Sequence, residues 1–349
     1  METNVIACGR DEASWAGALE EAATWLQRDY PVAFPTETVY GLGANAFSSQ
    51  AVRRIFAAKG RPADNPLITH IARLEQLDSV VSEVPAWAEK LMARFWPGPL
   101  TLVLPAHARV AREVTAGLAT AGVRMPAHPL AQALILTSGL PLAAPSANRS
   151  GRPSPTQAAH VVQDLEGRIP LILDGGPTAH GVESTVLSCV SWPPTLLRPG
   201  SITKKELEKA LGEEVRSASV QDNERSAPAS PGMKYTHYAP RGELWLVEGE
   251  LEQVRRLIGQ KVAEALRGGR RAGILTTSEG CLHYPQGVVV SCGWRSDLAS
   301  VARGLFAALR RLDEAGVEVI YAETFPREGL GEAVMNRLDK ASGSRLLRA

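Results

Sequence analysis

Two short loops in the first half of the chain carry polar side chains at a spacing that suits an anionic substrate. Lys59 and Arg61 lie two residues apart in a Lys-Gly-Arg-Pro sequence, so both cationic groups can reach one anion. Arginine offers a rigid fork of donors to phosphate or carboxylate oxygens, and lysine offers a mobile point charge. Ser146 and Asn148 have the same spacing in a later loop and could hold phosphate oxygens without adding charge. Together these residues indicate a site for a nucleotide triphosphate.

A second set of residues could bind a small zwitterion beside the nucleotide. Arg124 lies in a turn-like segment with a nearby glycine and proline, which suits a fixed clamp on a carboxylate. Thr38, His70 and Ser184 are candidate ligands for hydroxyl and amine groups. Each such residue taken alone more often has a structural role, and it is the joint pattern that favours a site. No Ser–His or Cys–His nucleophile stands out, so we expect catalysis by positioning and charge stabilisation.

Several motifs of known chemistry match weakly or are missing. Gly41-Leu-Gly-Ala-Asn-Ala46 fits the loose dinucleotide fingerprint, but Pro35 interrupts the strand before it and Asp64 lies in a loop-like segment. Ser201-Ile-Thr-Lys204 mimics a Ser-x-x-Lys nucleophile but is better explained as a helix start. The sequence has no Walker-type phosphate loop, no C-x-x-C and no H-x-x-x-H. A cysteine or histidine metal site and a disulfide framework are therefore not expected.

The composition is that of an ordinary globular protein. Of the 349 residues, 44% are hydrophobic and 21% are charged, and no apolar run is long enough to span a membrane. The N-terminal residues lack a basic start followed by an apolar stretch, so no signal peptide is expected, and the scattered cysteines fit a cytoplasmic location. Residues 51–150 hold 11 basic and 6 acidic side chains. That excess suits a small polyanion and is too small for a strongly basic nucleic-acid surface.

The first two hundred residues read as a mixed α/β segment with many proline and glycine turns, which must position these loops. Apolar spacing and caps predict helices over 14–29, 48–58, 85–95, 127–138 and 204–211. Short apolar runs predict strands over 31–34, 67–71, 100–104, 140–144 and 170–174.

The chain changes character after residue 212. Residues 213–241 are a polar linker that ends in the more aromatic SPGMKYTHYAP, and residues 242–349 alternate between strand and helix patterns. That alternation predicts a smaller, parallel, doubly wound α/β domain after a mixed α/β domain over 1–212. The predicted strands are 243–247, 272–276, 287–291 and 317–322, and the predicted helices are 250–267, 297–314 and 329–341.

Three segments carry a resemblance to a known family. KGRP…NPL, APSAN-x-SG-x-PSPT and FPTETVYGLGANA resemble the threonylcarbamoyl-AMP synthase family, whose signature pairs a K-x-R with a later S-x-N. All four signature residues are present, and the likeness covers about residues 10–210. SPGMKYTHYAP and the C-terminal domain resemble the longer, two-domain form of that family. The resemblance implies a YrdC-like mixed α/β catalytic domain with a twisted open sheet, followed by a smaller Rossmann-like domain.

The same resemblance implies a nucleotidyltransferase that condenses L-threonine, bicarbonate and ATP into threonylcarbamoyl-AMP and pyrophosphate. A downstream tRNA-modifying transferase complex would move the threonylcarbamoyl group to the adenosine beside the anticodon of ANN-decoding tRNAs, with weak tRNA binding by this chain left open. Mg²⁺ would arrive on the ATP, since no carboxylate cluster forms a protein cage.

The family motif also implies roles for individual residues. The implied catalytic residues are Lys59, Arg61, Ser146 and Asn148. The implied threonine ligands are Thr38, His70, Arg124, Ala144 and Ser184. The implied ATP ligands are Arg61, Asn65, Thr120, Ser146, Ser154, Arg198 and Tyr238. We interpret Tyr235, His237 and Tyr238 as a lid over the reactive adenylate, and the competing interpretation is a strip that fastens the domains together.

Two other functions remain open from the sequence. The chain could be an RNA-binding module without chemistry, although its charge gives this reading little support. It could also be a carbamoyl-transfer enzyme of metallocentre maturation, but such enzymes need zinc-finger modules, and this chain has no C-x-x-C.

Overall fold

A computed structural model describes residues 1–9, 11–218 and 237–349 of the chain. The contacts divide it into two compact units. The first comprises Met1–Ser150, Pro155–Ala179 and Glu183–Lys234. The second comprises Gly151–Ser154, His180–Val182 and Tyr235–Ala349. Two short segments that precede residue 212 thus belong to the second unit, which no local sequence pattern indicated.

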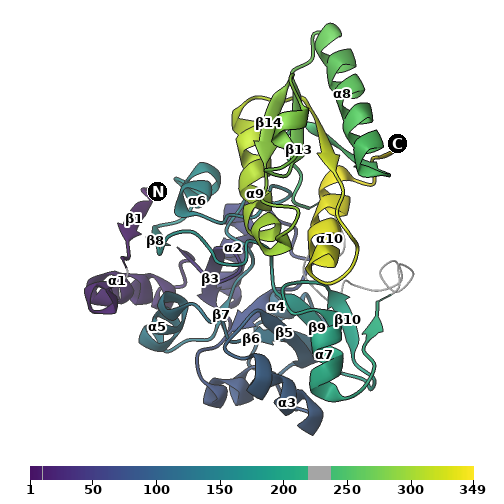
Figure 1. Ribbon diagram of the computed structural model, residues 1–349. Helices are drawn as coiled ribbons and strands as arrows, with labels where there is room; N and C mark the ends of the chain where they lie inside the picture. The colour runs from purple at the N-terminus through teal and green to yellow at the C-terminus, as the bar shows by residue number, and fades with distance from the viewer. Residues whose placement is uncertain (10, 219–236) are drawn as a thin grey trace. The chain divides into compact units, whose positions relative to one another are not determined.

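The first unit is built on a mixed sheet of eleven strands in the order β1-β8-β2-β3-β7-β4-β6-β5-β9-β10-β11 (Figure 1). Its strands are β1 (Asn4–Ala7), β2 (Val32–Phe34), β3 (Gly41–Asn45), β4 (Ile68–His70), β5 (Leu100–Pro105), β6 (Thr120–Arg124), β7 (Leu142–Ala143), β8 (Leu171–Asp174), β9 (Thr185–Ser188), β10 (Thr195–Arg198) and β11 (Arg216–Ser217). Both parallel and antiparallel pairs occur in it, which confirms the predicted mixed α/β fold.

Helices cover both faces of this sheet. They are α1 (Ala16–Gln27), α2 (Ser49–Lys59), α3 (Ala86–Phe95), α4 (Arg112–Thr115), α5 (Pro129–Ser138), α6 (Ala158–Leu165) and α7 (Lys204–Leu211). Adjacent residues of β2 point to opposite faces, so Val32 and Phe34 pack in one hydrophobic cluster and Ala33 packs in the other. Both faces are therefore buried.

Local caps fix the ends of the helices that matter for the site. The Ser48 hydroxyl accepts from the Ala51 amide at 3.2 Å, so α2 begins where the sequence predicted. Gly60 takes the left-handed conformation (φ 61°) that ends the helix, which leaves Lys59 as its last residue. Thr203 caps α7 in a capping box, so the Ser-x-x-Lys match is a helix start.

The glycine pair of the dinucleotide-like motif has a packing role. Gly41 and Gly43 lie in β3, which pairs antiparallel with β2. A Cβ at Gly43 would lie 2.6 Å from the Phe34 ring. Only glycine lets that ring cross the strand, so the motif does not mark a nicotinamide site.

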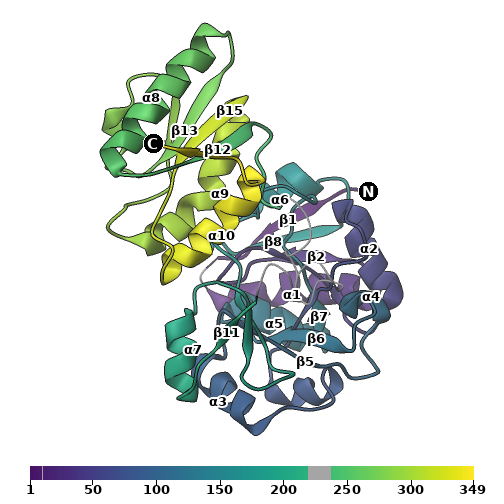
Figure 2. The same cartoon turned by 90° about the vertical axis from the view of Figure 1, so that its right-hand side faces the viewer.

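The second unit is a parallel five-stranded sheet in the order β14-β13-β15-β12-β16, as predicted for a doubly wound domain. Its strands are β12 (Glu243–Glu248), β13 (Ala272–Thr276), β14 (Val288–Ser291), β15 (Val319–Glu323) and β16 (Leu346–Arg348). Figure 2 shows α8 (Leu251–Arg267) on one face and α9 (Leu298–Glu314) and α10 (Leu330–Ser342) on the other. The last strand, β16, was not predicted.

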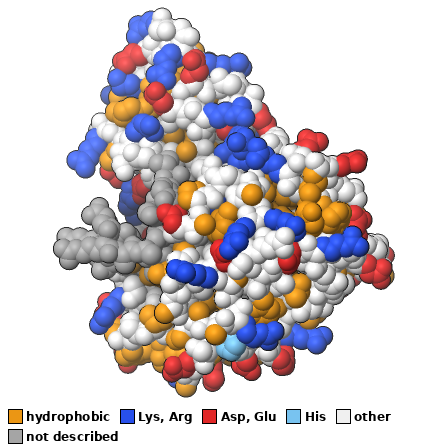
Figure 3. All heavy atoms as spheres, turned by 180° about the vertical axis from the view of Figure 1, so that it is seen from behind, with side chains coloured by type: hydrophobic (Ala, Val, Ile, Leu, Met, Phe, Trp, Pro, Cys, Tyr) orange, Lys and Arg blue, Asp and Glu red, His pale blue; other side chains and the backbone are white. Residues whose placement is uncertain are grey.

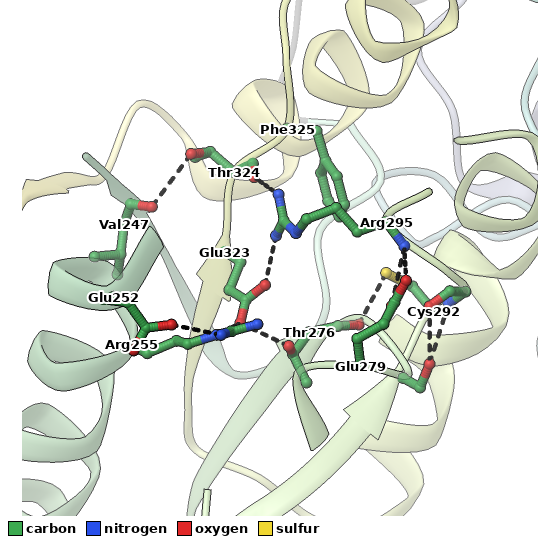
Figure 4. A network of polar contacts seen from close by, with 12 residues as sticks. Val247, Glu252, Arg255, Thr276, Glu279, Cys292, Arg295, Glu323, Thr324 and Phe325 are labelled. Carbon is green, nitrogen blue, oxygen red and sulfur yellow. Dashed lines mark hydrogen bonds and ion pairs between the residues drawn. The ribbon is translucent and has the colours of Figure 1, made fainter. Parts of the chain in front are cut away.

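A buried carboxylate joins the carboxyl ends of the strands in this unit (Figure 4). Glu323 ends β15, is 1% exposed, and accepts hydrogen bonds from Thr276 at 2.7 Å and Tyr284 at 2.9 Å. Arg295 donates to its second oxygen at 2.5 Å. Doubly wound domains usually bind ligands at this edge, between β13 and β15. In this unit that edge is occupied by an ion pair between Glu323 and Arg295.

Among the helices of the described residues, none combines the length and the apolar character that a membrane crossing requires.

Candidate active site

Two neighbouring strands of the first unit place a histidine and an arginine side by side. β4 and β6 run parallel, and His70 is the register partner of Arg124. Paired residues on adjacent strands point to the same face of a sheet. Both residues end their strands, so both side chains reach the loops at that edge. Ala144 joins this edge through its amide, which donates to the Ile68 carbonyl at 2.8 Å.

Arg124 is held in one orientation by three partners. Its Nε donates to the Gly98 carbonyl at 3.0 Å, one terminal nitrogen donates to the Thr38 hydroxyl at 2.9 Å, and the other lies 2.5 Å from the Glu37 carboxylate. The arginine is 3% exposed. Sequence reasoning identified Arg124 and Thr38 but missed Glu37. The signal was present, because Glu37 precedes Thr38 in the same motif.

The two ionisable neighbours of Arg124 have shifted pKa values. Burial raises the pKa of the Glu37 carboxyl, but the charge and hydrogen bond of Arg124, with backbone amides, outweigh burial and lower it overall. Burial, reinforced by the charge of Arg124, lowers the pKa of His70 to about 3. His70 is therefore a neutral imidazole near pH 7, and its Nδ1 lies 3.2 Å from the Ile68 carbonyl. The pair Glu37–Arg124 has no net charge.

A second buried cluster lies around the start of β9. The Ser184 and Thr101 hydroxyls are 2.8 Å apart, and Arg198 donates to the Ser184 hydroxyl and to its carbonyl, each at 3.1 Å. Arg198 ends β10 and is 4% exposed. The structure thus brings together Ser184 and Arg198, which the family motif implied as ligands of two different substrates. Thr101 was not predicted as a member of this cluster.

The four signature residues come from two loops, which Lys59 ties together. Its Nζ donates to the carbonyl oxygens of Ser146 and Asn148, both at 2.5 Å. The Ser146 hydroxyl donates to the Asn148 side chain at 2.5 Å. The lysine is 3% exposed, and burial, with the charge of Arg61, lowers its pKa well below the ordinary value, although Asp164 opposes them. An anion beside Lys59 would favour its charged form.

Arg61 and Asn65 sit in the loop that follows α2. One Arg61 terminal nitrogen donates to the Asn65 carbonyl at 3.1 Å and to the Pro66 carbonyl at 3.3 Å, which fixes the loop. The Asn65 side chain is 1% exposed, and within the described ranges neither its oxygen nor its nitrogen has a hydrogen-bond partner. Buried amides are normally paired, so this one is ready for a ligand. Thr120 is half-buried at the start of β6.

The remaining predicted residues that the structure describes lie in the second unit. Ser154 is fully buried there. The Tyr238 ring packs against Phe306 with centroids 5.2 Å apart, and His237 lies beside it at 5.7 Å. Tyr235 falls outside the described residues. In the described part of the chain, no group of three or more acidic, histidine or cysteine side chains could hold a metal ion.

Comparison with known proteins places this chain in a family. A family model described as telomere recombination matches residues 24–200, and one described as threonylcarbamoyl-AMP synthase, C-terminal domain, matches residues 202–343. A threonylcarbamoyl-AMP synthase of Bacillus subtilis is 54% identical over 332 residues, which cover 95% of this chain and 94% of that protein. The chain belongs to the threonylcarbamoyl-AMP synthase family.

Other relatives of this synthase family extend the likeness to both units. The threonylcarbamoyl-AMP synthase of Pyrococcus abyssi is 51% identical over 327 residues, covering 94% of each chain. The crystal structure of P. abyssi Sua5 complexed with L-threonine matches with a TM-score of 0.93 and 49% identity, covering 99% of this chain and 100% of that one. The likeness therefore includes the C-terminal domain as well as the catalytic one.

Proposed function

We propose that this protein is an L-threonylcarbamoyladenylate synthase. It condenses L-threonine, bicarbonate and ATP into threonylcarbamoyl-AMP and releases pyrophosphate. The proposal is carried by the match of this chain to 94% of the length of a protein named threonylcarbamoyl-AMP synthase. In this chain Lys59 is hydrogen-bonded to the carbonyl groups of Ser146 and Asn148 in one cluster. An RNA-binding module and a metallocentre carbamoyl-transfer enzyme are not favoured, because neither would share both units with these relatives.

Threonine fits the neutral pair formed by Arg124 and Glu37. The guanidinium would face the carboxylate of the zwitterion, and Glu37 would face its ammonium group. His70 stays neutral, so it adds a hydrogen-bonding group without a second positive charge. Thr38 is already bonded to Arg124, and it would complete the contacts together with Ala144 and Ser184.

ATP would be held mainly by polar side chains that are buried or half-buried. Arg61 and Arg198 supply charge, the unpaired amide of Asn65 supplies a donor and an acceptor, and Ser146 supplies a hydroxyl. We assign Thr120 to the same nucleotide, and the roles that the family motif implies for Ser154 and Tyr238 stay predictions. Mg²⁺ would arrive on the triphosphate and neutralise part of its charge, since the described residues offer no acidic cage.

The reaction depends on stabilisation of the negative charge that develops on the phosphate and does not need a protein nucleophile. The threonine amine and bicarbonate form a carbamate with loss of water. An oxygen of this carbamate attacks the α-phosphorus, a new P–O bond forms, and the bond to the β-phosphate breaks to release pyrophosphate. Lys59 and Arg61 would stabilise the negative charge that grows on the phosphate oxygens. The carbonyl contacts of Lys59 fix its ammonium group before the substrate arrives, so little reorganisation is needed.

The product is a reactive mixed anhydride, which suits prompt transfer to another catalyst. We propose that a tRNA-modifying transferase complex accepts the threonylcarbamoyl group and attaches it to the adenosine beside the anticodon. The cytoplasm, where tRNA is modified, is then the expected place of action.

A direct assay tests the proposal. The full chain is incubated with threonine, ¹⁴C-bicarbonate, ATP and Mg²⁺, and both pyrophosphate and a labelled, acid-labile adenylate are measured. The synthase should form both in equal amounts, only when threonine is present. Pyrophosphate release that is independent of threonine, or the absence of a labelled adenylate, would overturn the assignment. Denatured protein and a reaction without bicarbonate are the controls.

A further inference from the structure

A surface groove in the first unit is separate from the residues assigned to catalysis. It lies between the 3₁₀ helix η2 (Leu74–Ser79) and α3, and it has a volume of about 770 Å³. Its floor is apolar and belongs to the main hydrophobic cluster. The floor residues are Leu77, Val81, Met92 and Met125. A hollow of this size is large enough to bury several side chains of a ligand.

The groove keeps apolar surface exposed at its edge. Leu74 lines it and is 55% exposed, and Pro97 also lines it and is exposed. Trp96 lies half-buried beside Pro97. The space-filling view shows hydrophobic side chains among acidic and basic ones along the lower part of the face it presents (Figure 3). Exposed apolar surface that is contiguous with a hollow is typical of an interaction site.

Every charged residue that lines the groove is acidic. These residues are Asp78, Glu83 and Glu89, and all three are exposed. Within the described residues none of the three carboxylates forms an ion pair or a hydrogen bond. The basic residues of α3, Lys90 and Arg94, do not line the groove. The charged groups that line the groove are therefore all negative, which favours a positively charged occupant.

The residue that follows two lining residues of the groove is hydrogen-bonded to the arginine of the candidate active site. Trp96 and Pro97 line the groove, and the next residue, Gly98, accepts the hydrogen bond from Arg124 Nε at 3.0 Å. The Gly98 amide donates to the Met125 carbonyl at 2.8 Å, and Met125 is a floor residue. An occupant that presses on this wall would touch the residues that orient Arg124.

We propose that this groove is a docking site for a protein partner that inserts apolar side chains flanked by lysine or arginine. The apolar floor would take the hydrophobic side of an amphipathic helix, and the three carboxylates would pair with its basic flanks. The groove and its charge exist whatever reaction the active site catalyses, so the proposal does not rest on the proposed function.

Two variants on the same helix separate docking from general attraction to an acidic surface. Ala93 lies on α3, is exposed and lines the groove, so Ala93→Arg places a like charge where the basic flanks would bind. Ala86 is an exposed alanine of the same helix that does not line the groove, and Ala86→Arg is the matched control. The probes are two fluorescein-labelled amphipathic helical peptides of leucine and lysine, identical except that one has glutamate in place of every lysine.

Fluorescence anisotropy of the peptides with the full chain gives the result. The lysine peptide should bind saturably and the glutamate peptide should not. Ala93→Arg should weaken binding about tenfold or more, because like charges at an interface are strongly unfavourable. Ala86→Arg should change it by less than about twofold, since its charge lies outside the groove. The double reversal Asp78→Lys with Glu89→Lys should transfer the preference to the glutamate peptide, with circular dichroism confirming that each variant is folded.

Several outcomes would overturn the docking proposal. Equal binding of the two peptides, or equal effects of the two arginine variants, would mean that no specific docking site exists. Binding of 4-phenylbutylamine that Ala93→Arg abolishes, without binding of the lysine peptide, would make the groove a site for small amphipathic amines instead. Threonine-dependent pyrophosphate release by Ala93→Arg is measured in parallel, so that failure of docking is distinguishable from failure of the synthase assignment.

Discussion

Removal of the negative charge at Glu37 should destabilise the protein even without substrate. The Glu37 carboxylate and the Arg124 guanidinium are 2.5 Å apart, and their side chains are only 9% and 4% exposed. Loss of one partner of a buried ion pair leaves the other charge uncompensated and costs about 3–5 kcal/mol. Glu37→Gln keeps the shape and one acceptor oxygen, so we expect the lower end, about 3 kcal/mol. In urea this corresponds to a midpoint lower by about 1 M.

A surface pair provides the matched control for that measurement. Arg270 lies 3.2 Å from Glu243, and the two side chains are 43% and 51% exposed. Exposed pairs contribute about 0–1 kcal/mol, so Glu243→Gln should change the free energy of unfolding by less than about 1 kcal/mol. The assay is urea unfolding followed by circular dichroism at pH 7. Equal losses of unfolding free energy for Glu37→Gln and Glu243→Gln would refute the argument that burial gives the Glu37–Arg124 pair its large contribution.

The pH dependence tests the same reasoning with its sign fixed. The folded protein lowers the pKa of Glu37 below its ordinary value of 4.5, so the carboxylate contributes stability above pH 4.5. That contribution is lost as pH falls through the lower, folded pKa. The difference in stability between the wild type and Glu37→Gln should therefore be constant between about pH 5 and 7 and should shrink in stronger acid. A difference that vanishes already at pH 6 would contradict the pairing.

Four further outcomes are expected. Lys59→Ala or Arg61→Ala should reduce synthesis by about 100- to 1,000-fold in a folded protein, measured as threonine-dependent pyrophosphate release, and near-normal turnover would refute their role. The activation free energy with serine should be about 1–3 kcal/mol higher than with threonine, and 2-aminobutyrate should be rejected more strongly. A kcat/KM for 2-aminobutyrate equal to that for threonine would mean that the hydroxyl is not recognised. The folded protein lowers the pKa of His70 from 6.5 to about 3, so the neutral imidazole contributes its full stability above pH 6.5 and loses it as pH drops toward 3. The urea midpoint of His70→Gln should therefore depend less on pH between 6.5 and 3 than the midpoint of the wild type. Glu323→Gln should lower the stability of the second unit by about 3 kcal/mol, because Arg295 is left without its carboxylate, and an unchanged melting temperature would show that Glu323 contributes nothing.

Much of the local structure could be predicted from the sequence, because short-range signals determine it. The capping serine of α2, the Thr203–Glu206 capping box and the strand–helix alternation after residue 242 are formed by residues within a turn or a few turns of each other. The K-x-R and S-x-N spacings were likewise local, which is why the loops of the candidate site were found.

Short strands and two helices were not predicted. β1, β3, β6, β9, β10, β11 and β16 have two to five residues, and helices α4 and α6 were also missed. β3 is Gly-Leu-Gly-Ala-Asn, whose residues have no strong preference for a strand. Its conformation is decided by hydrogen bonds to β2 and β7, which come from other parts of the chain. Such pairing is invisible in a local window.

The sequence by itself determined which residue types could do the chemistry, and the tertiary structure decided their partners. Arg124 meets Thr38 across 86 positions of the chain, and Lys59 reaches the Ser146 and Asn148 carbonyls across 87 and 89 positions. The same packing buries Glu37 against Arg124 and keeps His70 neutral. Charge state and orientation depend on burial and on neighbours brought together by the sheet, and these are properties of the folded chain as a whole.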